Sequence, residues 1–105
     1  MTDAVLVLVT APSTDVAASI ARAVVEERLA ACGNVLPGVR SIYRWEGRVQ
    51  DEPEVLLLLK TQRSSFPKLR DRILALHPYE VPEVVALPIE AGSDAYLDWI
   101  ARSMS

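Results

Sequence analysis

The sequence predicts a single α+β domain over residues 1–105, and three observations support this prediction. Apolar runs rich in valine and leucine, such as residues 4–9 and 55–59, are typical of buried strands. Other stretches carry apolar residues at helical spacing, and residues 39–45 alternate with a period of two. No linker, repeat or low-complexity tract separates these stretches, so we assign them to one domain.

The first predicted strand covers residues 4–9, and a helix follows it. Ser13 or Thr14 can cap this helix, with Asp15 in its first turn, where a negative charge is favourable. The apolar residues that recur at helical spacing are Val16, Ile20, Ala23, Val24 and Leu29. Because glycine is the usual residue just past a helix end, we expect this helix to stop near residues 31–33.

A long β-hairpin is predicted next. In its first strand Val39, Ser41, Tyr43 and Trp45 fall on one face, and Arg40, Ile42 and Arg44 on the other. Residues 46–47 are the candidate turn, and residues 54–60 form the returning strand. Pro37 and Pro53 cannot donate a hydrogen bond to a sheet, so we expect each of them at an edge or a bulge.

The second helix is predicted to end at a rigid corner. Ser64 or Ser65 can cap it, and Pro67 suits its first turn. Its expected buried stripe consists of Phe66, Leu69, Ile73 and Leu76. Pro78 stops the helix, which places His77 at the helix end.

A fourth strand and a short helix complete the prediction. The strand covers residues 83–89, and residues 92–94 open the helix, with Ser93 as its cap. The apolar side of this helix is expected to consist of Leu97, Ile100 and Ala101, with Tyr96 or Trp99.

The order strand, helix, strand, strand, helix, strand is the ferredoxin-like split βαβ arrangement. Its two main helices cover one face of a four-stranded sheet. The predicted strands at residues 4–9, 55–59 and 84–87 are apolar at nearly every position, so the other face of the sheet is apolar as well. Because a large apolar surface in water favours association, we predict a compact homo-oligomer in which sheets pack on one another.

Composition excludes several classes of function. A formal net charge of -3 and the lack of a basic cluster give no reason to expect nucleic acid or an anionic membrane as partner. One cysteine cannot form an internal disulfide, so nothing requires an oxidising compartment. The apolar run at residues 4–9 is too short for a signal sequence or a membrane span. We therefore expect a soluble, cytoplasmic protein with no membrane partner.

Several motifs together resemble the CutA divalent-cation tolerance proteins. They are Val9-Thr10-Ala11-Pro12, Leu29-Ala30-Ala31-Cys32 with Asn34, Ser41-Ile42-Tyr43-Arg44-Trp45-Glu46-Gly47, Glu54 leading to Lys60-Thr61, His77-Pro78-Tyr79-Glu80-Val81-Pro82 and Tyr96-Leu97-Asp98-Trp99. The resemblance covers essentially the whole chain. It implies a ferredoxin-like fold, a tight homotrimer closed by strand pairing between subunits, and a link to copper tolerance and copper binding. Trimers of this shape also resemble nitrogen-signalling proteins that bind small ligands between subunits, which is an analogy of fold alone.

His77 and Cys32 are the candidate metal ligands. Imidazole suits Cu(II) or Zn(II), and the alternative is that His77 stabilises the C-terminus of its helix as a cation. Cys32 is a soft ligand for Cu(I), but an isolated cysteine is more often a small buried apolar group. Some CutA members carry a cysteine and a second histidine, both proposed as copper ligands, where this chain has Val9 and Leu76. Without CxxC, HxxxH or HExxH spacing, we expect any site for Cu(II) or another divalent cation to be weak or assembled from several chains.

A second candidate site is a polar cleft near His77 and Cys32 that holds a small ligand or anion. Its residues are Cys32, Tyr43, Trp45, Glu54, Lys60, Tyr79 and Glu80. The ammonium group of Lys60 ends an apolar strand and needs a partner, which Glu54 or Glu80 can supply. The alternative is that the aromatic residues serve in packing, which we favour for Tyr43 and Trp45, and that the charges form structural ion pairs.

No organic cofactor and no catalytic activity are predicted. Cys32 and His77 are the only nucleophile and base that match by residue type, and both are expected at C-terminal helix ends, which do not lower the pKa of a thiol. The sequence has no glycine-rich phosphate loop and no nucleophile elbow. Three hypotheses follow: a trimeric metal-tolerance protein with modest copper affinity, a signalling or ligand-binding trimer, and an interaction scaffold.

Overall fold

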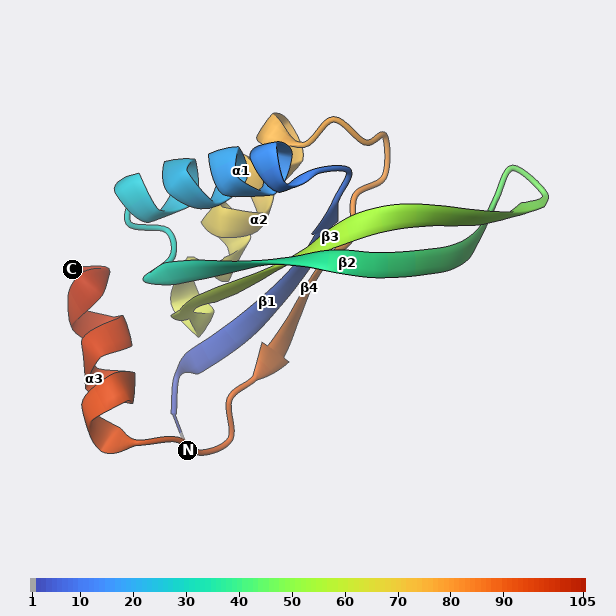
Figure 1. The fold of residues 1–105 in the computed structure, drawn as a ribbon. Coiled ribbons are helices and arrows are strands. Elements are labelled where there is room, and N and C mark those ends of the chain that lie inside the picture. Colours follow the sequence, from blue (N-terminus) through green and yellow to red (C-terminus); the bar gives the residue numbers. More distant parts are fainter. Residues whose placement is uncertain (1) are drawn as a thin grey trace.

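The predicted ferredoxin-like fold is confirmed by the computed structural model, which describes residues 2–105. The elements are β1 (Ala4–Ala11), α1 (Thr14–Glu26), β2 (Cys32–Trp45), β3 (Arg48–Gln62), a 3-10 turn (Arg63–Ser65), α2 (Phe66–Leu76), β4 (Val84–Pro88) and α3 (Asp94–Ser103). The strands form one four-stranded sheet in the order β2-β3-β1-β4, and every neighbouring pair is antiparallel (Figure 1). The two halves of the split βαβ unit therefore meet at the central strands β1 and β3.

The main core lies between the sheet and the helices α1 and α2, which cover the same face (Figure 1). Alternate residues of the central strands point into this core because successive strand side chains lie on opposite faces. The fully buried large side chains are Val7, Val9, Ile20, Val24, Leu57, Leu59, Leu69 and Ile73, with Ile100 of α3. Helix α3 lies apart, at the end of the sheet where β1 begins, and packs there against Ala4 and Ala31.

The β2-β3 hairpin projects beyond the rest of the sheet (Figure 1). Pairing of β3 with β1 ends at Val55, whereas pairing of β3 with β2 continues to Arg48. The turn at residues 46–47 has positive φ at both positions, as a tight two-residue hairpin turn requires. The predicted bulge is confirmed for Pro37, because the register shifts between Leu36 and Val39.

Pro53 lies in the projecting part of the hairpin, opposite Arg40. At Pro53, β3 pairs only with β2 among residues 2–105, because the pairing of β3 with β1 ends at Val55. The expected edge position of Pro53 is therefore confirmed.

The end of the first helix differs from its prediction. Helix α1 ends at Glu26, and Arg28 adopts a left-handed conformation with φ 60°. The chain therefore leaves the helix before residues 31–33, where the glycine had led us to expect its end. Leu29 then donates its N–H to the carbonyl of Val24. Gly33 lies in β2 and serves packing: a Cβ atom there would sit 3.0 Å from Cβ of Ala21.

The predicted caps and helix faces are confirmed in part. Ser13 Oγ accepts a hydrogen bond from the N–H of Val16 at 3.2 Å, whereas Ser65 and Ser93 occupy the cap positions of α2 and α3 without a side-chain bond. Helix α2 ends at Leu76 with His77 as its cap, as predicted. Leu76 itself is exposed and not part of the buried stripe, because it lies in the last turn, beyond the edge of the core.

The face of the sheet opposite α1 and α2, called here the open face, is apolar as predicted. Its apolar side chains belong to Leu6, Leu8, Leu36, Leu56, Leu58, Val85 and Leu87. Val85 is 46% exposed and Leu87 is 49% exposed. A contiguous apolar surface of this kind marks an interaction site on a folded protein.

No helix within residues 2–105 is both long enough and apolar enough to cross a membrane.

The contact between Gly33 and helix α1 yields the first prediction. Gly33→Ala places a methyl group 3.0 Å from both Cβ of Ala21 and Cδ2 of Leu59, so we expect the free energy of unfolding to fall by about 1–3 kcal/mol. Denaturant titration at fixed protein concentration measures this loss. Gly92→Ala is the matched control, because its new methyl group meets the movable end of Leu97 at 3.3 Å. Equal midpoints for the two variants would contradict the packing role of Gly33.

Candidate functional site

The His77 ring ties the corner after α2 to the end of β1. His77 is 7% exposed, and its Nε2 lies 2.7 Å from the carbonyl oxygen of Thr10. Its Nδ1 accepts a hydrogen bond from the backbone N–H of Tyr79 at 3.1 Å. Because a peptide N–H can only donate, Nδ1 carries no proton, and Nε2–H donates to Thr10. The ring is therefore the neutral tautomer with both nitrogens in use.

This geometry bears on both interpretations of His77. The ring bonds to β1 and to the following loop, whereas the backbone N–H of His77 is the group that bonds to α2, at the carbonyl of Ile73. The neutral tautomer does not supply a cation to the C-terminus of α2. A metal ion at Nδ1 would have to replace the Tyr79 N–H, so ligation by His77 stays a prediction that requires local rearrangement.

Tyr79 extends this connection to the hairpin. Its phenol ring lies beside the His77 ring at a tilt of 52°, with ring centroids 4.6 Å apart. The phenol donates a 2.7 Å hydrogen bond to Oε2 of Glu54 on β3. Burial raises the pKa of the Tyr79 phenol well above its usual range, and the bond to Glu54 raises that pKa further. Tyr79 therefore remains a hydrogen-bond donor throughout the physiological pH range.

A cleft of about 620 Å³ opens between the projecting hairpin and the loop from α2 to β4. It is lined by Thr10, Ser41, Ile42, Tyr43, Trp45, Glu54, Pro78, Tyr79, Glu80, Val81 and Glu83. The structure thus brings together Tyr43, Trp45, Glu54, Tyr79 and Glu80 of the predicted cleft. The hairpin supplies one wall and the Pro-bounded corner supplies the other, so two rigid segments position these side chains.

Sequence reasoning missed Thr10, Ser41 and Glu83 as cleft residues. Ser41 carried a usable signal, since it alternates with Tyr43 on one face of β2. Thr10 and Glu83 carried none, because their positions depend on how the corner folds back over the sheet.

Lys60 and Cys32 lie elsewhere, at the other end of the hairpin. The ammonium of Lys60 donates to Oδ1 of Asn34 at 2.6 Å, and Cys32 is its cross-strand neighbour. Lys60 follows Glu54 by six residues on β3, roughly 20 Å at about 3.3 Å per residue. The prediction that Glu54 or Glu80 pairs with Lys60 is therefore wrong, because the strand carries the two ends apart.

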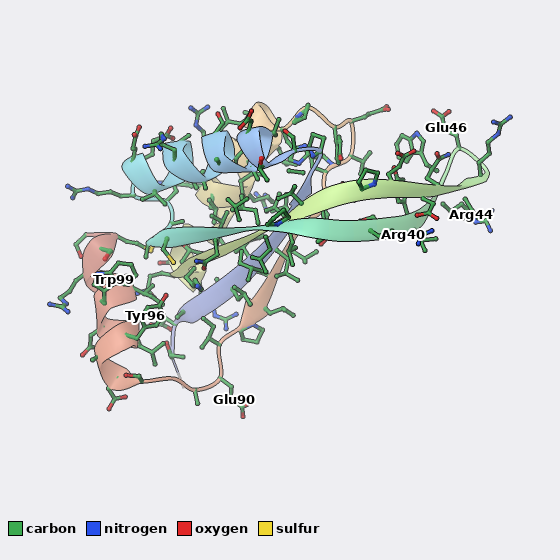
Figure 2. All side chains as sticks on the ribbon, in the orientation of Figure 1. Arg40, Arg44, Glu46, Glu90, Tyr96 and Trp99 are labelled. Atoms are coloured by element: carbon green, nitrogen blue, oxygen red, sulfur yellow. The ribbon has the colours of Figure 1, made fainter. Side chains whose placement is uncertain are left out.

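Cys32 is half-buried, and its Sγ lies 3.6 Å from the phenol oxygen of Tyr96 on α3. The hydrogen bond with Cys32, and then burial, raise the pKa of the Tyr96 phenol. Tyr96 and Trp99 stack with centroids 5.6 Å apart and remain 42% and 39% exposed. Figure 2 shows both on α3, at the opposite end of the molecule from Arg44 and Glu46 of the hairpin. The predicted apolar side of α3 is confirmed for Ile100 and Leu97, whereas Ala101 is exposed.

Among residues 2–105, no three His, Cys, Asp or Glu side chains gather in a group that could hold a metal ion.

Comparison with known proteins decides the family. The family described as CutA1 divalent ion tolerance protein matches residues 5–103. This chain belongs to that family. Among relatives, it is 60% identical over 98 residues to the divalent-cation tolerance protein CutA of Thermus thermophilus, covering 93% of this chain and 95% of that protein. It is 53% identical over 94 residues to the human protein CutA, covering 90% of this chain and 52% of that protein.

Solved CutA structures share the fold over nearly the full chain. CutA from Xylella fastidiosa superposes with a TM-score of 0.96 at 39% identity, covering 99% of this chain and 100% of that chain. Cut A1 from Thermus thermophilus superposes with a TM-score of 0.90 at 59% identity, covering 92% and 94% of the two chains. The chain spans about half the length of the human and Arabidopsis CutA relatives. The names of the CutA relatives and their fold do not indicate an enzyme.

The bond from Tyr79 to Glu54 predicts an alkaline transition. Because the folded-state pKa of Tyr79 is raised above its ordinary value of 10.0, the stability from this phenol is fully present below about pH 10 and is lost as pH rises toward the folded-state pKa. We expect spectrophotometric titration at 295 nm to show a late-ionising tyrosine that Tyr79→Phe removes, and the variant to lose less stability in this range. An unchanged titration curve in Tyr79→Phe would contradict the assignment.

Proposed function

We propose that this chain is a homotrimeric divalent-cation tolerance protein that binds Cu(II) or another divalent cation weakly, at sites that more than one subunit completes. The observation that carries the proposal is the apolar open face, whose leucine and valine side chains need a cover that residues 2–105 of one chain do not provide. Family membership supports the divalent-cation role, since the Thermus relative bears that name.

Association has a clear physical origin in the open face. Fully burying a Leu or Val side chain stabilises by about 1.5–3 kcal/mol, and this face carries several of them, Leu36, Val85 and Leu87 among the exposed ones. The outer edges of β2 and β4 have no strand partner within residues 2–105, so they offer backbone groups for pairing with further copies. Apolar cover and strand pairing together favour a closed assembly.

Weak metal binding follows from the ligands that a single chain offers. Imidazole is the strongest candidate ligand for Cu(II), and His77 is the only histidine of the chain. Its two ring nitrogens already have partners, so ligation costs at least one of these hydrogen bonds. Further ligands must then come from neighbouring carboxylates or from another subunit.

A second candidate function is small-ligand binding. The cleft beside Tyr79 favours it, because its volume of about 620 Å³ and its aromatic lining are those of a small-molecule site. Lys60 is excluded from this cleft by its bond to Asn34 at the other end of the hairpin.

We also infer a cytoplasmic location, on the ground that a single half-buried cysteine needs no oxidising compartment. Among similar proteins, an Arabidopsis relative is named chloroplastic and an Archaeoglobus structure periplasmic.

Association through the open face predicts a specific response to charge. Leu87→Glu places a carboxylate in that face, so we expect analytical ultracentrifugation to show a trimer for the wild type and mainly dissociated subunits for the variant. Leu74→Glu is the matched control, since Leu74 on α2 is 45% exposed and Leu87 is 49% exposed. A folded wild-type monomer at micromolar concentration, or equal dissociation by both variants, would count against the proposal.

The copper hypothesis is tested most directly by electron paramagnetic resonance. Since the chain has one histidine, nitrogen hyperfine coupling from imidazole on bound Cu(II) can come only from His77. We expect saturable Cu(II) binding by calorimetry with this coupling, and loss of the coupling with roughly tenfold weaker binding in His77→Ala. Circular dichroism of the variant checks that the fold persists. Cu(II) binding without imidazole coupling would exclude His77 as a ligand.

A further inference from the structure

We propose that the cleft between the hairpin and the α2–β4 loop binds a small organic cation, an ammonium group attached to an apolar body. This inference rests on the second candidate function, small-ligand binding, and is independent of metal coordination.

The first argument is charge. Glu54, Glu80 and Glu83 line the cleft, and no Lys or Arg is among its lining residues within the described part of the chain, 2–105. Over the same residues, no salt bridge engages any of these glutamates. Elsewhere within residues 2–105, three acidic side chains have basic partners: Asp51 with Arg40, Asp71 with Arg70 and Glu27 with Arg72. The cleft therefore carries negative charge that a bound cation would compensate.

The second argument is the aromatic lining. Tyr43 and Trp45 project from the hairpin into the cleft, and Tyr79 faces it from the loop. All three are partly exposed, at 43%, 40% and 37%. An ammonium group over the face of such rings gains about 0.5–2 kcal/mol from the ring quadrupole. Aromatic rings beside carboxylates are thus suited to an organic cation.

The third argument is rigidity. The 2.7 Å bond from Tyr79 holds the Glu54 carboxylate at the cleft, and the His77 ring in turn fixes the backbone of Tyr79. The corner and the Glu54 carboxylate are therefore held in place before a ligand arrives, which lowers the ordering cost of binding.

The lining also distinguishes an organic cation from a bare metal ion. A divalent cation needs several ligands converging on one point, and within residues 2–105 no three His, Cys, Asp or Glu side chains form such a group. A cleft of about 620 Å³ instead suits a ligand of several carbon atoms, whose apolar body contacts the rings.

The test uses choline as the probe and 3,3-dimethyl-1-butanol, its uncharged isostere, as the comparison. The chain has two tryptophans, so a Trp99→Phe background leaves Trp45 as the sole tryptophan, located in the cleft. With EDTA present and ionic strength constant, we expect a saturable change in Trp45 fluorescence with choline. We expect at least about tenfold weaker binding of the alcohol.

Matched variants separate the cleft from general surface charge. Glu80→Gln removes a carboxylate from the cleft and should weaken choline binding about three- to tenfold. Glu90→Gln makes the same change outside the cleft, on the segment between β4 and α3 (Figure 2), and should leave binding unchanged. Tyr43→Leu keeps apolar bulk without the ring and should weaken choline more than the alcohol.

Three results would overturn the proposal: no saturable response to choline, equal binding of choline and the alcohol, or equal effects of Glu80→Gln and Glu90→Gln. Sedimentation of the same samples measures their oligomeric state, so the test of choline binding is independent of the test of the proposed trimer. If a trimer fails to respond to choline, only the organic-cation inference falls.

Discussion

The hydrogen bonds of the His77 ring are the constraint on which the candidate site depends. One imidazole joins the carbonyl of Thr10 at the end of β1 to the N–H of Tyr79 after α2. This position fixes the backbone of Tyr79, whose phenol then reaches Glu54 on β3. The His77 ring and the Tyr79 phenol thereby hold together three segments that are distant in sequence. Because an unpaired polar group in this place would be costly, the ring contributes to the fold as well as to the cleft.

One face of the sheet is buried under the helices and the other is the open face, and alternation along the strands gives each face its own set of side chains. In β3, Val55, Leu57 and Leu59 are buried under the helices, whereas Leu56 and Leu58 point to the open face. The first set stabilises the folded subunit. The second set supplies apolar area for contacts outside it, and this division explains why strands with continuous apolar sequence occur in a sheet that helices cover on one side only.

Much of the fold could be predicted from the sequence because strong local signals agreed with one another. The order of elements, the hairpin, the bulge at Pro37 and the helix end at His77 all follow from apolar periodicity and from proline chemistry. The end of α1 could not be predicted, because the glycine near it serves close packing and Arg28 takes the left-handed position.

The candidate site was predictable only where its residues share a short segment or a strand face. Tyr79 and Glu80 follow His77 directly, and Tyr43 and Trp45 alternate on β2, so these four were found together. Lys60 was predicted wrongly as a cleft residue, because the sequence does not show that the extended strand β3 separates Lys60 from Glu54 and the cleft. Lys60 bonds to Asn34 instead. Which residues of β2 lie near Lys60 depends on the register of the hairpin, and a bulge of uncharged residues in β2 shifts that register.

The bulge at residues 37–38 has a consequence for solubility. An outer strand that runs straight and uninterrupted can recruit strands from other molecules without limit, as in amyloid growth. In β2 the register shift and the proline at residue 37 interrupt that outer strand midway. Only short stretches of backbone then remain open to recruitment, which favours an assembly of defined size over an endless fibre.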